Sequence, residues 1–446
     1  MRMMGSGRGA RGVSSAPLSG IVMTSPSPTE PASGRGDPRR RLLLHLFQTA
    51  LASVDGRVCV REALTLPPST SPAPRRRVWV AAIGKAASAM VLGAHDALGD
   101  ALEYILVITK DGHAAVPLYG LPQAEIIESA HPIPDQRSLA AGARLLEWVD
   151  SVPRDVELLF LISGGASSLV ESLVHGATLA QLTELNKRGL ASGLSIGELN
   201  AQRAQLSRIK GGRLAARLGG RPARALFISD VPGHDPAVIG SGLMGPSASS
   251  QPGPADDGIE RRVIASIDIA AKAVRAEAQA LGLAAWRDGH SFDGPAERLA
   301  VRFAHELHMH PDQVRIWGGE SVVTLPENPG RGGRNQHLAL AAARIIAGHD
   351  NLLLLVAGTD GTDGVTSDAG GLVDGETCSR IALGNFDVQK CLDTADSGAA
   401  LAASGDLIHT GPTGTNVGDL VIGLKLTREA AAELLQNRDA PTSRML

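Results

Sequence analysis

Apolar runs of strand length alternate with helix-like stretches along most of the chain. Runs beginning at Val78, Tyr104 and Leu158 are predicted to be strands, and the residues after them have the apolar spacing of helices. An opening helix is predicted over 39–54, directly after an Asp-Pro start signal. Because such alternation with short loops is typical of parallel sheets covered on both faces, the pattern predicts an α/β protein whose ligand lies at the carboxyl ends of the strands.

The pattern continues in the second half of the chain. There it predicts a helix over 259–281 and separate strands over 314–317, 321–325 and 420–424. A chain of 446 residues exceeds what one hydrophobic core usually serves, so we expect two parallel-sheet domains with the active-site cleft between them. The predicted divisions are a disordered leader over 1–38, a large N-terminal domain over 39–300 and a C-terminal domain over 301–430.

Composition narrows the class of ligand. The net charge of -3 and the aromatic content of 3% argue against a nucleic-acid groove, and small-molecule chemistry is favoured. Cys59, Cys378 and Cys391 show neither the pattern of a disulfide framework nor that of a zinc site, which fits a reducing compartment. No apolar run approaches the ~20 residues that cross a bilayer. We therefore expect a cytoplasmic protein without nucleic-acid or membrane partners.

The stretch LLFLISGGASSLVE, residues 158–171, reads as a buried strand, a tight turn and the start of a helix. Backbone N–H groups in such a turn are free to bind an anion, most often a phosphate. Ser163, Gly164 and Gly165 are therefore candidate phosphate-binding residues. The alternative is that the two glycines only make the turn tight.

Basic residues beside glycines are further candidates for binding phosphate. Lys85 follows a predicted strand, and Lys210 precedes a glycine pair, although each has the alternative of a solvated surface position. The segment GRGGRNQ places Arg331 and Arg334 in a glycine turn before a helix, where guanidinium groups can grip a phosphate or carboxylate; a plain basic loop is the alternative. Asn335 would also cap that helix.

Carboxylates gather in the predicted turns as well. Asp230 follows a strand, Glu320 lies in GGE, and Asp360 and Asp363 lie three residues apart in a Gly/Thr loop. Phosphoryl transfer needs ligands for a divalent cation and a base for the attacking hydroxyl, and acids at strand ends supply both. Asp230, Asp360 and Asp363 are the candidate metal ligands, and Asp230 and Asp360 the candidate bases. Ordinary turn chemistry is the alternative for any one of them.

Three familiar motifs are not supported as functional sites. The segment VIGSGLMG matches the dinucleotide-binding glycine pattern at Gly240, Gly242 and Gly245, but prolines surround it where the motif requires a strand before and a helix after. No Walker pattern occurs, and Ser163 precedes its glycines instead of standing between them as in a nucleophile elbow. The sequence thus disfavours a nicotinamide cofactor and acyl transfer.

A set of motifs in fixed order resembles the glycerate 2-kinases of bacteria and animals, a family with a C-terminal leucine-rich module of the MOFRL type. The motifs are IGKAASAM, TKDGH, AHPIPD, LISGGASSLV, LSRIKGGRLA, SDVPGHDP, WGGES, GRGGRNQ, AGTDGTDG and TGPTGTNVGDL. Members are often labelled hydroxypyruvate reductases. The chain departs from the family pattern at Ser241 to Met244, at His337 and at Ala395 to Ser397, and these changes bear on substrate or donor preference.

The resemblance implies ATP-dependent phosphorylation of D-glycerate to 2-phosphoglycerate with Mg²⁺, by two Rossmann-like domains with the site between them. It implies Lys85 and Arg334 as catalytic residues and adds Asn416, in the last motif, to the binding residues. Glycerate and ATP are the expected partners, and a homodimer stays open. The rival hypotheses are an NAD(P)-dependent hydroxypyruvate reductase and a non-enzymatic phosphosugar-binding module.

Overall fold

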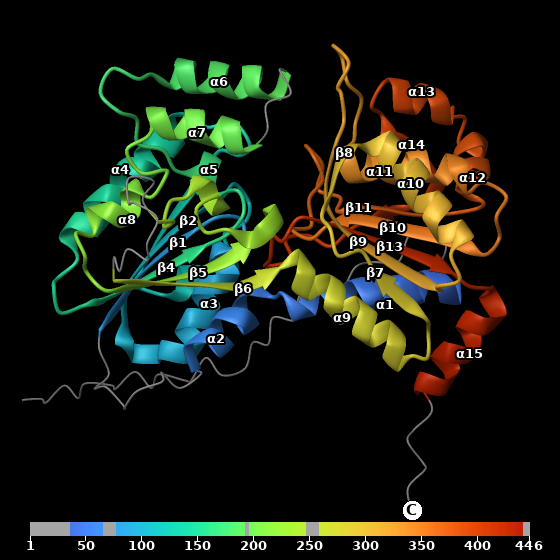
Figure 1. Ribbon diagram of the computed structural model, residues 1–446, viewed down its shortest axis with the longest axis horizontal. Helices are drawn as coiled ribbons and strands as arrows, with labels where there is room; N and C mark the ends of the chain where they lie inside the picture. The colour runs from blue at the N-terminus through green and yellow to red at the C-terminus, as the bar shows by residue number, and fades with distance from the viewer. Residues whose placement is uncertain (1–35, 66–76, 192–195, 247–257, 440–446) are drawn as a thin grey trace, which may run out of the picture.

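The computed structural model describes residues 36–65, 77–191, 196–246 and 258–439, and it contains two β-sheets that lie side by side with helices on both faces (Figure 1). Of the predicted leader, residues 1–35 lie outside the described residues. Asp37 accepts a hydrogen bond from the Arg39 backbone N–H and caps helix α1 (Pro38–Ser53), which confirms the predicted opening helix. No helix in the described ranges is long and apolar enough to cross a membrane.

The first sheet is parallel throughout, with the strand order β3-β2-β1-β4-β5-β6. This is the order of a dinucleotide-type Rossmann sheet, so the Rossmann-like prediction is confirmed for this half. Right-handed crossover helices cannot all lie on one face, and they cover both faces here (Figure 1). The strands are β1 (Val78–Ile83), β2 (Leu102–Lys110), β3 (Ala124–Ser129), β4 (Glu157–Ile162), β5 (Ala223–Ser229) and β6 (Ile259–Ser266).

The helices of this half come mainly from the connections between those strands. They are α2 (Gly56–Thr65), α3 (Ala87–Leu98), α4 (Gln136–Ser151), α5 (Ala166–Leu169), α6 (Leu179–Ala191), α7 (Ile196–Leu206) and α8 (Arg213–Arg217). Helix α5, which follows the glycine turn after β4, has only 4 residues. The helix expected at this point is therefore a single turn, and its dipole contributes little to anion binding.

The second sheet is mixed, and the prediction of a parallel sheet is wrong for this half. Its strand order is β12-β11-β10-β13-β9-β7, with β8 also paired to β9. The pairs between β10, β11, β12, β13 and β9 are antiparallel, whereas β7 and β8 run parallel to β9. The strands are β7 (Ala285–Arg287), β8 (Phe292–Pro295), β9 (Val314–Val322), β10 (Leu352–Gly358), β11 (Gly370–Asp374), β12 (Leu407–Ile408) and β13 (Asp419–Lys425).

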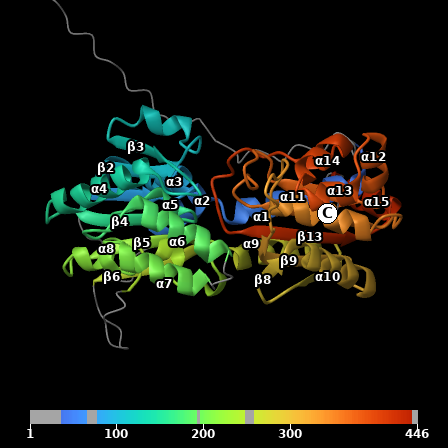
Figure 2. The ribbon, with the colours of Figure 1, turned by 90° about the horizontal axis from the view of Figure 1, so that it is seen from above.

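The sheets do not divide the chain at the boundary predicted after residue 300. Strands β7 and β8 precede that boundary but pair with β9. Helix α1 also belongs with the second sheet, because it packs on α9, α15, β10 and β13, and in Figure 2 its blue ribbon lies among these later elements. The helices of this half are α9 (Ile267–Ala280), α10 (Ala296–Met309), α11 (Arg334–Ile345), α12 (Thr377–Leu383), α13 (Val388–Asp393), α14 (Ser397–Ser404) and α15 (Arg428–Asp439).

Two local predictions fail for identifiable reasons. The helix predicted over 259–281 begins only at Ile267, because β6 forms the edge of the first sheet and its alternating exposed residues suit a strand. The two strands predicted on either side of Gly318-Gly319 form the single strand β9. The two glycines do not form a turn; they allow neighbouring segments to pack directly against the backbone of β9. A Cβ on Gly318 would lie 2.3 Å from Ile267 Cγ1, and one on Gly319 would lie 2.1 Å from the Phe292 carbonyl oxygen.

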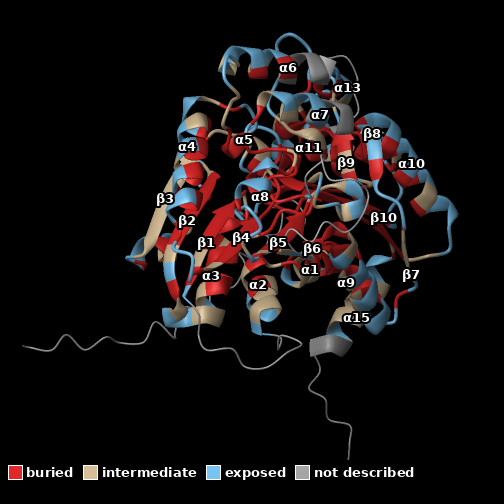
Figure 3. Cartoon of the chain, turned by 60° about the vertical axis from the view of Figure 1, so that its left-hand side comes forward, coloured by how far each residue is buried: buried red, intermediate tan, exposed pale blue. Residues whose placement is uncertain are grey.

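The central strands of both sheets are buried, whereas edge strands such as β3 are only partly buried and the outward helix faces are exposed, as Figure 3 shows. One hydrophobic cluster below the sheets contains Val80 and Ile105 of the first sheet together with Leu355 and Ile422 of the second. Two other clusters lie one on each sheet. The halves therefore share a continuous apolar layer on one side.

We expect Gly319→Ala to lower the free energy of unfolding by about 1–3 kcal/mol, because the added methyl group would collide with backbone that cannot move aside easily. Denaturant unfolding monitored by circular dichroism measures the change. Gly120→Ala is the control, since a Cβ there meets nothing within 4 Å. Equal stability of the two variants would contradict the close packing of β8 against β9.

Candidate active site

The loops after β1, β4 and β5 meet the second sheet at one place. Lys85 follows β1, the Ser163–Gly165 turn follows β4, and Asp230 follows β5. Strands β1 and β4 are neighbours whose connections leave in opposite directions across the sheet, which makes this edge the switch point of the strand order. Ligands of open α/β sheets bind at such a point, outside the carboxyl ends of the strands. The fold therefore brings Lys85, the Ser163–Gly165 turn and Asp230, which the sequence predicted separately, to the same edge of the first sheet.

Lys85 joins the two halves through an ion pair. Its Nζ donates a hydrogen bond of 2.5 Å to Oδ2 of Asp360, which follows β10 of the second sheet. Burial alone would raise the pKa of Asp360, but the Lys85 ammonium outweighs this effect and holds that pKa at about 2. Asp360 also accepts the backbone N–H of Thr362 at 2.9 Å. The carboxylate is thus ionised and engaged at both oxygens.

Gly164 lies where groups from both halves press on the backbone. A Cβ at this position would be 2.1 Å from Nδ2 of Asn416 and 2.2 Å from Oδ2 of Asp230. The backbone N–H groups of Gly164 and Gly165 have no acceptor among the described residues. Glycine is required here because two polar side chains occupy the space of any side chain. The turn therefore has two backbone donors without an acceptor, close to side chains of both halves.

The Ser163 hydroxyl has a structural partner in the same turn. It accepts a hydrogen bond of 3.1 Å from the backbone N–H of Ala86, and the Ser163 backbone N–H donates to Ile83. The side chain is fully buried. Ser163 therefore ties the loop after β4 to the loop after β1 and fixes Gly164 and Gly165 beside Lys85.

Arg334 begins helix α11 and reaches two acids of the second sheet. Its Nε donates to Asp419 at 2.7 Å and its Nη2 donates to Glu320 at 2.8 Å. Burial opposes the charged guanidinium, but Asp419 and Glu320 raise the pKa of Arg334 well above its ordinary value. Asn335 donates its Nδ2 to Asp419 at 3.0 Å and shares this network. The remaining terminal nitrogen of Arg334 has no partner among the residues that the structure describes.

Asp230 differs from Asp360 in its surroundings. Burial raises the pKa of Asp230, and the positive charges of Lys85 and Arg334 only partly oppose that rise. No ion pair or side-chain hydrogen bond to its carboxylate is found within the described ranges. The charges of both Lys85, from the first half, and Arg334, from the second, act on this carboxylate.

Comparison with known proteins shows which family the chain belongs to. Residues 42–279 match the model of a domain of unknown function, DUF4147, and residues 313–419 match the MOFRL family. The chain is 37% identical over 382 residues to the D-glycerate 2-kinase of Thermotoga maritima, covering 78% of this chain and 90% of that protein. The chain belongs to the glycerate 2-kinase family.

Other similarities agree with this assignment. A crystal structure of glycerate kinase from Thermotoga maritima superimposes with a TM-score of 0.73 at 34% identity, covering 86% of this chain and 99% of that chain. A protein of Agrobacterium vitis, named provisionally as a hydroxypyruvate reductase, is 33% identical over 85% of this chain and 93% of its own length. The prediction of family and α/β fold class is thus confirmed for this glycerate 2-kinase family member.

Some predicted binding residues lie elsewhere or are engaged differently. Lys210 is buried and pairs with the buried Glu171 at 2.6 Å, so the prediction that it binds phosphate is wrong. Arg331 pairs with Asp368 at 2.6 Å rather than joining Arg334. Asp363 accepts the backbone N–H groups of Asn335 and Gln336 and so caps helix α11.

The predicted metal set of Asp230, Asp360 and Asp363 does not converge. Asp363 is used as a helix cap and Asp360 as the partner of Lys85. No group of three or more His, Cys, Asp or Glu arranged to hold a metal ion is found in the described part of the chain. A magnesium ion bound with a nucleotide needs only one or two protein carboxylates in addition to phosphate oxygens. Of the predicted ligands, only Asp230 has a carboxylate that fits this need.

Lys110, His113 and His131 lie near Lys85; of these, the sequence suggested only His131 as a residue that could touch substrate, with a structural loop histidine as the alternative. His131 lies against the glycine turn, since a Cβ on Gly165 would be 3.2 Å from its ring. Burial, followed by Lys85 and Lys110, lowers the pKa of His131 to about 3. His113 is buried and its pKa is lowered by burial and by Lys110. The motifs TKDGH and AHPIPD contain all three and were the available signal.

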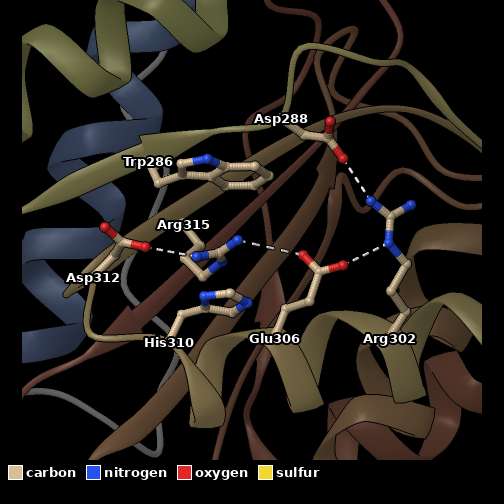
Figure 4. A pocket seen from close by; sticks show the side chains of 7 residues that line it. All are labelled: Trp286, Asp288, Arg302, Glu306, His310, Asp312 and Arg315. Carbon is tan, nitrogen blue, oxygen red and sulfur yellow. Dashed lines mark hydrogen bonds and ion pairs between the residues drawn. The ribbon is translucent and has the colours of Figure 1, made fainter.

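Two hollows lie outside this cluster. The first, of about 400 Å³, is lined by Trp286 and by charged side chains around Arg315 at the other end of β9 from Glu320 (Figure 4). Arg315 pairs with Asp312 at 2.6 Å and stacks 3.9 Å from the Trp286 ring, so its charge is already compensated. The second, of about 340 Å³, lies between the Pro232–His234 turn and the loop after β7.

The glycine pattern of a dinucleotide site lies in an irregular turn of this family member. Gly240 and Gly242 have φ values of 58° and 71°, and the segment forms a short 3₁₀ turn rather than a strand followed by a helix. The Ser241 hydroxyl there hydrogen-bonds with that of Ser167 at 2.7 Å. The exclusion of a dinucleotide fingerprint at this position is confirmed.

We expect Lys85→Met and Asp360→Asn each to lower the free energy of unfolding by about 3–5 kcal/mol, because each leaves its partner buried without a counter-charge. The double variant should be clearly more stable than the sum of the single losses. Denaturant unfolding of all three measures this coupling. The exposed Arg217–Asp150 pair is the control, with an expected coupling below about 1 kcal/mol. Additive losses at Lys85 and Asp360 would show that the pair does not join the halves.

Proposed function

We propose that the chain transfers the terminal phosphate of ATP to the 2-hydroxyl of D-glycerate and releases 2-phosphoglycerate and ADP. The observation that carries this proposal is the convergence of Lys85, the free backbone donors of Gly164 and Gly165, and Arg334 around Asp230. Phosphoryl transfer depends mainly on positioning and on compensating negative charge, and these groups suit both tasks. Membership of the glycerate 2-kinase family supports the choice of substrate.

The basic groups would act on the phosphate oxygens from opposite halves of the protein. Lys85 lies on the first sheet, and Arg334 with its unpaired Nη1 lies on the second. The amides of Gly164 and Gly165 provide donors that are already oriented. Because Asp360 fixes Lys85, and Asp419 and Glu320 fix Arg334, these acids position the basic groups. Preorganised donors of this kind stabilise charge without reorganisation during the reaction.

Asp230 is our candidate base. The 2-hydroxyl oxygen attacks the terminal phosphorus, the bond from that phosphorus to the ADP oxygen breaks, and the hydroxyl proton passes to the Asp230 carboxylate. The pKa of Asp230 is raised by burial, whereas the pKa of Asp360 is about 2, and a carboxylate with the higher pKa accepts a proton more readily. Asp360 is therefore assigned to holding Lys85, which revises its place among the candidate bases.

Magnesium, when bound, supplies positive charge to the phosphate oxygens. Asp230 is the predicted ligand whose oxygens fit such an ion, so the same carboxylate has two candidate roles. The assignment as base is preferred because Lys85 and Arg334 already place positive charge around it. A cytoplasmic location and a homodimer stay predictions.

The rival functions lack comparable support. A hydroxypyruvate reductase needs a nicotinamide site, and the matching glycine pattern is an irregular turn without the flanking strand and helix. A phosphosugar-binding module needs no group placed to receive a proton. The raised pKa of Asp230 supports its role as such a group.

We expect purified protein to form ADP from D-glycerate, ATP and Mg²⁺, and to oxidise neither NADH nor NADPH with hydroxypyruvate. Lys85→Met and Arg334→Gln should lower kcat by about 10²–10³-fold, because each removes charge that stabilises the transferring phosphate. Lys390→Met, a change on the exposed part of α13, is the control and should keep wild-type activity. Oxidation of NADH or NADPH without ADP formation would favour the reductase, and no turnover in either assay would favour the binding module.

We expect Asp230→Asn to lower kcat by about 10²–10⁴-fold while leaving unchanged the Mg²⁺ concentration that gives half-maximal rate, as for loss of a general base. Steady-state rates across a Mg²⁺ titration measure both quantities. Recovery of kcat at high Mg²⁺ would instead assign Asp230 to the metal. Folding of the variant is checked by thermal unfolding, where removal of a buried carboxylate should not lower the midpoint.

A further inference from the structure

Lys110 is a basic side chain beside the candidate site for which the proposed phosphate transfer assigns no role. It ends strand β2, next to β1, and it is half buried. Its ammonium interacts electrostatically with Lys85 and Asp360, so it lies near the pair that joins the two halves. No carboxylate in the described ranges lies within 4.0 Å of its nitrogen. An unpaired, partly desolvated ammonium at this edge is a candidate for binding an anion.

The charged side chains around Lys110 are paired with one another, so the positive charge of Lys110 is not compensated. Lys85 is paired with Asp360, and Asp111 is paired with Arg137 at 2.7 Å. His131 is neutral above about pH 3, because burial and the nearby lysines lower its pKa. Its ring nitrogens have no hydrogen-bond partner among the described residues. The cluster therefore offers one uncompensated positive charge and a neutral ring that can donate a hydrogen bond.

This charge suits a monoanion better than a nucleotide tail. A triphosphate carries several negative charges and needs several cations, whereas a carboxylate carries one. The position also suits a small 2-hydroxy acid. The carboxylate and the 2-hydroxyl are on adjacent carbons, so an anchor after β2 would place the hydroxyl toward the groups that follow β1, β4 and β5.

We propose that Lys110, assisted by His131, binds the carboxylate of the 2-hydroxy acid substrate and so determines which hydroxyl meets the phosphate. The loop that follows Lys110 is held by His113, whose backbone carbonyl oxygen accepts a hydrogen bond of 2.8 Å from Ser88 on α3. This inference rests on the proposed function. It goes beyond that function by naming the group on the substrate that is recognised and the side chain that recognises it.

The test compares D-glycerate with its uncharged amide, glyceramide, in the ADP-forming assay. We expect Lys110→Met to raise KM for D-glycerate by about 10- to 100-fold, the range for loss of a hydrogen bond between charged groups, and to leave KM for ATP unchanged. The wild type should prefer D-glycerate to glyceramide, and the variant should lose most of that preference. Lys110→Arg keeps the charge and should recover part of it. Lys390→Met is the matched control.

The outcomes separate the two proposals. A rise in KM for ATP, or an unchanged KM for D-glycerate in Lys110→Met, would overturn the carboxylate assignment while leaving the kinase function in place. A wild-type protein that forms no ADP with D-glycerate would overturn both. Lys110→Gln is a second neutral variant for use if the Met variant does not fold, and thermal unfolding identifies that case. We expect neither neutral variant to unfold below the wild type, because each removes an unpaired, partly buried charge.

Discussion

The ion pair between Lys85 and Asp360 is the interaction on which the site depends. It crosses from the first sheet to the second, and both side chains are largely removed from water. Neither charge is stable there without the other, so the loop after β1 and the loop after β10 have to meet for the protein to fold correctly. The side chain of Lys85 also lies beside the glycine turn after β4, since a Cβ on Gly165 would be 3.1 Å from its Cγ. The same ion pair therefore contributes both to stability and to the geometry of the candidate site.

Acidic and basic side chains of both halves meet at this junction. Lys85, after β1, and Lys110, at the end of β2, belong to the first sheet, whereas Arg334 and its partners Glu320 and Asp419 belong to the second. Asp230, after β5, is influenced by the positive charges of both Lys85 and Arg334. A reaction between two anions requires such positive charge, since their mutual repulsion has to be compensated.

Much of the first sheet could be predicted, because its strands are continuous apolar runs separated by helical patterns. The second sheet could not, since the antiparallel pairing of β9 with β13 joins segments about a hundred residues apart in the chain. The same limit applies to the site. Lys85 and Lys210 both lie beside glycines, but only a long-range partner, Glu171, makes Lys210 a buried structural residue. Gly318 and Gly319 resembled a turn because the sequence does not reveal that Ile267 and Phe292 press against them.

Helix α1 has a consequence for how the chain reaches this state during synthesis. It is the first described helix, and it packs mainly on α9 and also on α15, β10 and β13. Its buried Arg40 pairs with Asp374 and with Asp406 at 2.6 Å. Helix α9 follows the first sheet in the chain, whereas the partners of Arg40 come much later. Part of the surface of helix α1 and the charge of Arg40 therefore stay uncovered until these later segments have been made, and that interval is when a chaperone would have most to protect.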